Sequence, residues 1–441
     1  MTDQLPSVEH LVVLMLENRS FDHMLGFLYT DHDNLSPAGH PYDGLTGKES
    51  NPGPDGTPVT VFPIHPDHPH AYFMPGADPA EGYAATNDQL FGSPSAPVPP
   101  IAHNEGFVKD FATVLAHPRP GRPIVPGTVP GDIMGCYAPE TLPVLSGLAR
   151  GYAVCDRWFC PVPTETLPNR AFACAATSQG HMDDRTHTFA VASIFGLLTQ
   201  HRIPWRIHGY TAQPLTRGNF PDTSSADPGH FGRFADFTAA AAAGALPAFT
   251  FLEPSWSSTG NSQHPNYDVA LGEQLIHDTY RAVRTGAAWE RTLLVITYDE
   301  HGGCYDHVAP PVDAVAPDSS TGEFGFDFTR LGPRVPAVLV SPLIEPGTVF
   351  RAPAGALDHT SILRTVQRRW ALPALTLRDA AAPDFGGVLT RTRPRTDDPL
   401  DGVVVPASLG PNPAAGTLSH LAEVHAELTA RGLIPAEPGE V

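Results

Sequence analysis

Cysteine is scarce in this chain and accounts for only 5 of the 441 residues. The cysteines are too few and too irregularly spaced for a disulfide framework, and no CxxC pair is present. We expect buried thiols, while Cys155 and Cys160 stand close enough in sequence for a local disulfide in an oxidising compartment.

Positive charge is also scarce. The 27 Lys and Arg residues face 47 Asp and Glu residues, which gives a formal net charge of −20. A chain this acidic repels nucleic acid and other polyanions, so we expect no nucleic-acid partner. The same charge disfavours attraction to an anionic membrane surface.

Long apolar runs are absent. No stretch approaches the ~18 consecutive apolar residues of a membrane span. The first residues, MTDQLPSVEH, contain neither the basic start nor the apolar core of an export signal. We therefore expect no transmembrane segment and, by default, a cytoplasmic location. With 41% hydrophobic residues the chain can nevertheless bury a substantial core.

Three short apolar runs have the length and composition of buried strands: Leu11–Leu16, Thr292–Thr297 and Val335–Val340. Segments with helical character separate them. This alternation predicts an α/β architecture with a mainly parallel central sheet. The expected helices are Thr141–Gly151, Ala239–Ala243, Leu271–Ala287, His359–Trp370 and, in the tail, Leu418–Ala430.

The chain divides by composition into a body and two less regular segments. Residues 1–396 contain the strands and most of the helices, and we assign them to one catalytic domain. Within it, residues 35–130 are rich in Pro, Gly, His and Asp with little apolar periodicity, which is typical of a lid or binding loop. Residues 397–441 form a C-terminal extension with one predicted helix.

Polar residues follow the first two strands. Glu17 and Asn18 come directly after the first strand and offer two hard oxygen ligands for a divalent cation. The alternative is a helix cap, with Asn18 or Ser20 as the N-cap and Asp22 in the first turn. In parallel sheets, ligands bind beyond the carboxyl ends of the strands, where these residues fall.

The second strand ends in a denser cluster. Asp299, Glu300 and His301 precede two glycines that allow a sharp turn, and Asp306 and His307 follow. Such a concentration of ligating groups favours a metal or proton-transfer site over a solvated surface. The spacing matches neither a zincin helix nor an EF-hand loop, so other segments must complete the geometry.

A proline-punctuated loop, CPVPTETLPNR, supplies candidate nucleophiles. It presents Thr164 and Thr166 before Asn169 and Arg170. A threonine hydroxyl attacks only when activated, for example by a metal, and a nearby Asn and Arg would suit the developing charge of a phosphate. Taken alone, the same loop could be only a turn.

These clusters, in this order, resemble the bacterial phosphoesterase family of phosphatidylcholine-type phospholipases C and their acid phosphatase relatives. The resemblance implies an alkaline phosphatase-like, three-layer α/β/α sandwich with long loop insertions. The pair ENRSFDH and YDEHGGCYDHV is specific. The matching stretches are His10–Gly26, Met134–Arg170, Trp289–Pro311, Gly332–Pro342 and Leu357–Val366.

The resemblance also implies a single divalent-metal site. In the lipase branch a threonine followed by one residue and Pro-Asn-Arg is the nucleophile, and here that position is Thr166; PTET departs from the usual Gly-Pro before it, which keeps Thr164 as an alternative. Oxygen ligation favours Ca²⁺, Mn²⁺ or Mg²⁺, with Fe or Zn as alternatives. The implied ligands are Glu17, Asn18, Thr166, Asp299 and Glu300.

Family members bring histidines into the site. His103 and His264 match the positions of a proton-transfer residue, and His208 is a weaker match that we place with Asn169 and Arg170 as substrate-binding. We place His301, Asp306 and His307 around the ligands Asp299 and Glu300.

The sequence thus predicts cleavage of a phosphodiester with a phosphocholine-type headgroup, through a phosphothreonine on Thr166. The alternatives are a phosphomonoesterase like the acid phosphatases and a non-catalytic, metal-stabilised binding protein.

Overall fold

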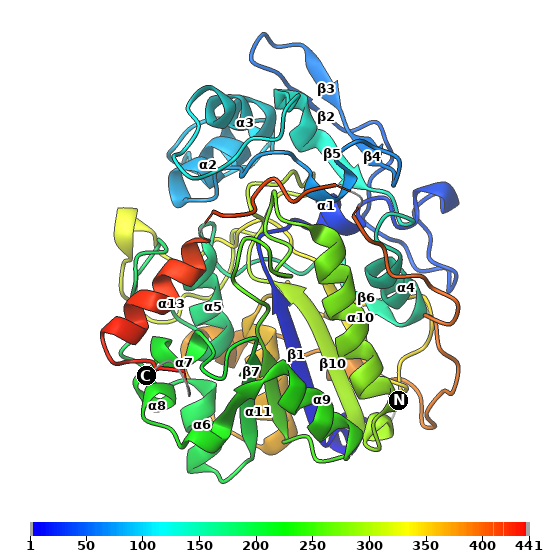
Figure 1. Cartoon of the computed structure of the whole chain (residues 1–441), viewed down its shortest axis with the longest axis vertical. Coiled ribbons are helices and arrows are strands. Elements are labelled where there is room, and N and C mark those ends of the chain that lie inside the picture. Colours follow the sequence, from blue (N-terminus) through cyan, green and yellow to red (C-terminus); the bar gives the residue numbers. More distant parts are fainter. Residues whose placement is uncertain (1–2, 409, 418, 438–441) are drawn as a thin grey trace.

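The computed structural model describes residues 3–408, 410–417 and 419–437. Its centre is an eight-stranded sheet of order β12-β6-β11-β10-β1-β9-β7-β8 (Figure 1). Within the described residues, β11 runs against the other strands of this sheet, so the sheet is mainly parallel, as predicted. The strands are β1 (His10–Leu16), β6 (Ala153–Val154), β7 (Trp205–Gly209), β8 (Phe231–Arg233), β9 (Phe249–Leu252), β10 (Thr292–Tyr298), β11 (Ala337–Val340) and β12 (Thr348–Val349).

The two central strands are the first two predicted runs. In both β1 and β10 the apolar residues are buried, as expected for strands covered on both faces. They pair in parallel with Leu16 opposite Tyr298, so both strands end at the same level of the sheet. The residues that follow them must therefore lie side by side.

The third predicted run differs in extent and direction. The strand β11 begins at Ala337 rather than Val335 and is antiparallel to β10. Pro336 has no N–H to donate to a ladder, which accounts for the later start. Because β11 runs in the opposite direction, Ser341 and Pro342 follow it at the end of the sheet where β1 and β10 begin.

Helices cover both faces of the sheet, which confirms the three-layer α/β/α sandwich (Figure 1). The helices α4 (Pro143–Gly151), α9 (Phe234–Ala242) and α10 (Val269–Thr285) lie on one face, and α5 (Thr166–Ala175), α6 (Ile194–Gln200) and α11 (Thr360–Trp370) on the other. Shorter helices are α1 (Phe21–Leu25), α7 (Thr216–Asn219), α8 (Pro221–Ser224) and α12 (Leu377–Ala381).

The predicted helices are present with shifted ends. The alanine run belongs to α9, which begins five residues earlier than expected, at Phe234, and is followed by Gly244 at φ +65°. Among the described residues, no helix has both the length and the apolarity needed to cross a bilayer. All five cysteines are buried and free, as expected for core thiols.

The region 35–130 is more ordered than its sequence predicts. It packs around a separate apolar cluster that includes Leu45, Phe107 and Phe111. Figure 1 shows it above the carboxyl ends of the central strands, and we use the name lid for residues 35–130 to denote this position. Its apolar residues are too irregularly spaced to show a helical or strand period. Its elements are β2 (Ser50–Pro52), β3 (Pro58–Thr60), β4 (Phe62–Ile64), α2 (Tyr83–Phe91) and α3 (Phe107–Ala116), and β4 pairs with β5 (Gly135–Tyr137).

The C-terminal extension packs on the body. Its helix, α13, spans His420–Ala430, and the predicted first residue, Leu418, lies outside the described residues. Leu400, Leu421 and Leu428 are buried in the same core cluster as the central strands. Residues after 396 therefore share the main hydrophobic core.

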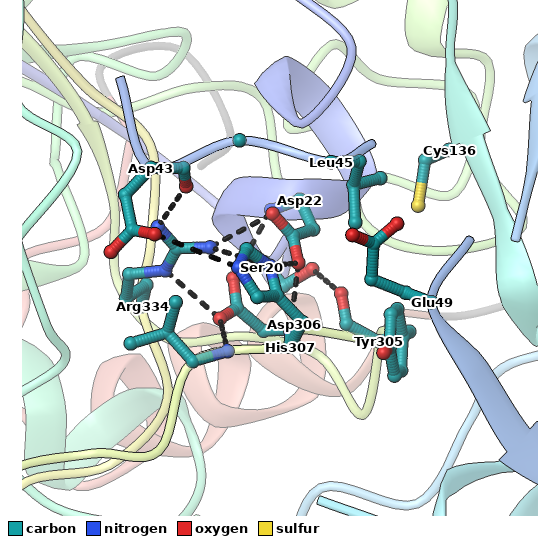
Figure 2. Close-up of polar contacts among 12 residues, drawn as sticks. Ser20, Asp22, Asp43, Leu45, Glu49, Cys136, Tyr305, Asp306, His307 and Arg334 are labelled. Carbon is teal, nitrogen blue, oxygen red and sulfur yellow. Dashed lines mark hydrogen bonds and ion pairs between the residues drawn. The ribbon is translucent and has the colours of Figure 1, made fainter. Parts of the chain in front are cut away.

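A buried ion-pair cluster joins the lid to the body (Figure 2). The fully buried Arg334 bonds Asp22 at 2.8 Å and Asp306 at 2.9 Å, and it donates to the Asp43 carbonyl at 2.7 Å. His307 Nδ1 lies 2.6 Å from Asp22 Oδ2. We call this group, with Asp43 at the start of the lid, the Arg334 cluster.

The Arg334 cluster corrects one expectation from the sequence. The side chains of Asp306 and His307 bond Arg334 and Asp22, and do not support Asp299 or Glu300. Asp22, Asp306 and His307 are near enough together to hold a cation, but Arg334 already supplies the positive charge there. Their contribution is to the attachment of the lid.

We predict a pH-dependent stabilisation by His307. Burial alone would lower the pKa of His307, but the charge of Asp22 and hydrogen bonds to Asp22 and Asp43 outweigh it and raise the pKa to about 10. The stabilisation is therefore complete below the unfolded-state pKa of about 6.5 and is lost as the pH rises through 10. His307→Gln should lower the free energy of unfolding by about 1–3 kcal/mol at pH 6.

The measurement is chemical denaturation of both proteins between pH 6 and 10.5. The difference between wild type and His307→Gln should shrink steadily with rising pH. A difference that stays constant over this range would contradict the ion-pair role.

Candidate active site

The paired strand ends bring the predicted metal ligands together. Glu17 and Asn18 follow β1, and Asp299 and Glu300 follow β10. The Asn18 N–H donates to Asp299 Oδ1 at 2.9 Å, which links the two segments directly. Asn18 has a φ of +56°, a left-handed conformation that asparagine tolerates better than most residues.

The turn after Glu300 is packed tightly against this segment. Gly302 and Gly303 both have positive φ, and a Cβ on Gly302 would lie 2.0 Å from the Asn18 carbonyl oxygen. Glycine is therefore required at position 302 for both conformation and space. The two glycines thus allow Glu300 to approach Asn18.

Thr166 is the first residue of α5 and is buried at the same place. Its hydroxyl donates to Asn18 Oδ1 at 2.9 Å. The positive end of the helix dipole faces this hydroxyl and favours negative charge there. Asp184 Oδ1 accepts from the next N–H, that of Leu167, at 2.6 Å and so fixes the start of the helix.

The helix-cap interpretation is confirmed for Ser20, one of the two N-cap residues that it named. Ser20 is the N-cap of α1 and accepts from the His23 N–H, while Asp22 lies in the first turn. The Asn18 side chain points instead to Thr166 and Glu81. One short segment therefore combines a structural cap with a candidate ligand.

The site has an excess of buried negative charge. Burial first, and then the charge of Asp299, raise the pKa of Glu17 to about 8. Burial, together with Glu81 and Asp299, holds the pKa of Glu300 well above its usual range. Glu300 Oε1 is buried without a hydrogen-bond partner. A divalent cation would relieve both the repulsion and the missing partner, so this oxygen-rich group fits one.

Further acidic residues lie near these candidate ligands, and no pattern in the sequence selects them. Glu81 Oε2 accepts from Asn18 Nδ2 at 2.9 Å, and Asp78 and Glu81 lie with His264 in one compact group. Asp184 and Glu165 belong to the segment around Thr166. Asp78 and Glu81 stand in the lid, away from any strand end or motif, so only their position in space reveals them.

Asn169 and Arg170 form hydrogen bonds that hold the segments of the site in place. Asn169 accepts from the Val162 N–H and donates to the Thr164 and Glu165 carbonyls, so its amide holds the nucleophile loop. Arg170 Nε bonds Asp299 Oδ2 at 2.8 Å, and its Nη2 donates to two carbonyls of β1. Both were predicted to bind substrate, and in the structure these atoms contact the protein.

Of the three predicted histidines, His264 is the one placed beside the acidic group. It is buried, with Nε2 3.7 Å from Asp78 Oδ1 and Nδ1 2.9 Å from the Pro265 carbonyl. Burial lowers its pKa to about 4, so the ring is neutral at pH 7. His103 is exposed in the lid, and His208 in β7 packs beside Phe237 of α9.

His301 supports the site as expected. Its Nδ1 lies 3.1 Å from Glu300 Oε2, and Nε2 bonds Gln89 of α2 at 2.7 Å. Burial lowers its pKa to about 3, so it is a neutral link between the lid helix and Glu300.

Comparison with known proteins assigns the chain to a family. The model of the Phosphoesterase family matches residues 8–373, which include all the site residues above. The chain is a member of the phosphoesterase family. It is therefore a hydrolase of phosphoester bonds.

The relatives of this phosphoesterase include plant and bacterial proteins. It is 36% identical to "Non-specific phospholipase C6" of Arabidopsis thaliana over 89% of this chain and 74% of that protein. It is 35% identical to "Non-specific phospholipase C3" of the same plant over 89% of this chain and 75% of that one. Identity to "Phospholipase C A" of Mycobacterium tuberculosis is 27%, over 94% of this chain and 84% of the other.

Similarity to solved structures is low. The PsFucS1 sulfatase from Pseudoalteromonas sp. has 13% identity and a TM-score of 0.33, covering 58% of this chain and 68% of its own. A protein in the alkaline phosphatase superfamily from Vibrio parahaemolyticus has 12% identity and a TM-score of 0.32, covering 55% and 64%. The sandwich architecture rests on the sheet and helices of this chain.

We predict that divalent metal stabilises this phosphoesterase increasingly as the pH rises. Because the pKa of Glu17 is raised to about 8, its ionisation in the metal-free fold costs stability as the pH rises from 4.5 to 8. A bound cation cancels this cost. Protein freed of metal with a chelator should gain thermal stability on addition of Mn²⁺, Ca²⁺ or Mg²⁺, more at pH 8 than at pH 5.

Thermal unfolding followed by fluorescence, with and without 1 mM metal as a typical excess, measures this gain. The matched variant Glu300→Gln should lose most of it, whereas Glu290→Gln, at an exposed residue just before the start of β10, should keep it. An equal gain for all three proteins would place the cation elsewhere.

Proposed function

We propose that this phosphoesterase is a metal-dependent phosphodiesterase of the phospholipase C type, with Thr166 as its nucleophile. The observation that carries the proposal is the hydrogen bond from the Thr166 hydroxyl to Asn18, within a group of oxygen ligands at the start of a helix. The names of the relatives, phospholipases C from a plant and a bacterium, support the choice of a phosphodiester.

Glu17, Asn18, Asp299, Glu300 and the Thr166 hydroxyl would hold the cation. When bound, a cation supplies Lewis-acid chemistry, because it lowers the pKa of a ligated hydroxyl and neutralises a phosphoryl oxygen. Arg170 keeps Asp299 in place through its ion pair at 2.8 Å.

In the first step the Thr166 oxygen attacks phosphorus and the bond to the leaving alkoxide breaks. The helix dipole of α5 favours the negative charge at this position. In this step Thr166 loses one proton and the leaving alkoxide gains one. Neutral His264 can accept the first and donate the second, which makes it the better candidate than the exposed His103.

In the second step water hydrolyses the phosphothreonine. His264 takes a proton from the water, the new bond from oxygen to phosphorus forms, the bond from Thr166 to phosphorus breaks, and the proton then passes from His264 to the Thr166 oxygen, which restores the starting state. Asp78, 3.7 Å from His264 Nε2, favours the imidazolium that results.

The net charge of −20 favours a zwitterionic substrate such as a phosphocholine ester over an anionic lipid surface. Hydrolysis of p-nitrophenyl phosphorylcholine and of p-nitrophenyl phosphate by metal-loaded protein compares a diester with a monoester. Preference for the diester is expected. Preference for the monoester would move the protein to the phosphatase alternative.

We predict that Thr166→Ala lowers kcat on the diester by about a thousandfold or more, because the attacking oxygen is removed. Metal content, measured by elemental analysis, should stay near that of the wild type. Thr166→Ser should retain part of the turnover.

The matched control is Thr164→Ala, two residues away. The Thr164 hydroxyl donates to the Met182 carbonyl at 2.7 Å and therefore has a partner within the loop. This variant should keep its turnover. Loss of turnover in Thr164→Ala but not in Thr166→Ala would exchange the two residues.

A further inference from the structure

Arg122 is a lid residue that reaches the acidic group of the site. Its Nε lies 3.4 Å from Asp78 Oδ2, and its side chain is 22% exposed. Asp78 in turn lies with Glu81 and His264 in one group, and Glu81 bonds Asn18. Only Asp78 and Glu81 thus separate Arg122 from Asn18, which accepts the hydrogen bond from Thr166.

The position of Arg122 is fixed from below. Asn266, two residues after His264, donates to the carbonyl of Pro123 at 2.6 Å. This hydrogen bond ties the lid loop to the segment that carries the proposed proton-transfer histidine. The backbone next to Arg122 is therefore held by a contact with the body.

The electrostatics of Arg122 agree with this position. Burial alone would lower its pKa, but the negative charges of Asp78, Glu81 and Glu17 raise it. The positive charges of Arg170 and Arg122 both lower the pKa of Glu17 and so oppose the effect of burial. The charge of Arg122 therefore acts on Glu17, one of the proposed metal ligands.

Arg170 Nε and Nη2 are committed to Asp299 and to carbonyls of β1, which leaves only its Nη1 without a partner, whereas a phosphate group presents several oxygens. Arg122 has a weaker hold. Its carboxylate partner, Asp78, is shared with Arg119, whose Nη2 lies 3.2 Å from the same Oδ2. If Arg122 turned to a new anion, Arg119 would still neutralise Asp78.

We infer that Arg122 is the guanidinium that binds the phosphoryl oxygens of the substrate, with Asp78 as the carboxylate that holds it when no substrate is bound. The inference rests on the proposed function, and it deepens that function by making the lid part of the phosphate site. Arginine suits the role because its planar fork matches phosphate geometry.

The test is calorimetric titration of metal-loaded, full-length protein with inorganic phosphate and with phosphocholine. Arg122→Gln should weaken the affinity for both about 10- to 100-fold, the loss expected for charge-assisted hydrogen bonds. Arg122→Lys, which keeps the charge but not the fork, should fall between. Arg291→Gln, which removes an exposed ion pair with Glu9, is the control and should bind like the wild type.

A second variant separates binding from a structural role. Asp78→Asn removes the charge that competes with phosphate for Arg122, so phosphate affinity should rise. If the ion pair were only structural, Asp78→Asn and Arg122→Gln should change the phosphate affinity in the same direction. Weaker binding in Asp78→Asn, unchanged binding in Arg122→Gln, or no phosphate binding by the wild type would each overturn the inference.

Failure of the proposed function would look different. Phosphate binding is measured without turnover, so a wild type that binds phosphate through Arg122 but hydrolyses neither ester would refute the phosphodiesterase and leave the phosphate site standing. Circular dichroism checks the fold of each variant. Should Arg122→Gln unfold, the comparison of Arg122→Lys with the wild type still decides the role.

Discussion

The structure depends on one electrostatic constraint: carboxylates that follow adjacent parallel strands are forced together where water is excluded. The register of β1 with β10 places Glu17 beside Asp299, and burial with mutual repulsion raises the pKa of Glu17 to about 8. Such a group is stable only with compensating positive charge. Arg170 compensates Asp299, and a bound cation would compensate the remaining charge.

The lid completes this arrangement. Its Glu81 accepts a hydrogen bond from Asn18 and its Gln89 bonds His301, so these two side chains contact the body at the site, while Arg122 pairs with Asp78 within the lid. The Arg334 cluster attaches the same region to the body at a second place (Figure 2). A region whose composition suggests a mobile covering is therefore built into the active site.

Local patterns in the chain were enough to find the central strands, the residues at their ends and Thr166. They did not separate His264 from His103, because both are loop histidines and only burial beside Asp78 distinguishes them. They also selected Asn169 and Arg170 for substrate: the amide of Asn169 bonds its own segment and Arg170 bonds Asp299, while Arg170 Nη1 has no partner, so a substrate role for Arg170 stays a prediction. A motif identifies which residues are near a site, but hydrogen-bond partners decide what each is free to do.

The sequence by itself determined the α/β class and the acidic residues that follow two strands, because each depends on apolar periodicity or on neighbours along the chain. The segment Cys160–Arg170 was predicted to be a loop, and only the structure shows that Thr166 begins the helix α5. Tertiary structure alone decided the reversal of β11, the separation of Asp306 and His307 from the metal ligands, and the arrival of Asp78, Glu81 and Arg122. These residues are far apart in sequence from their partners. Their contacts arise from the packing of the lid on the body, which leaves no local pattern.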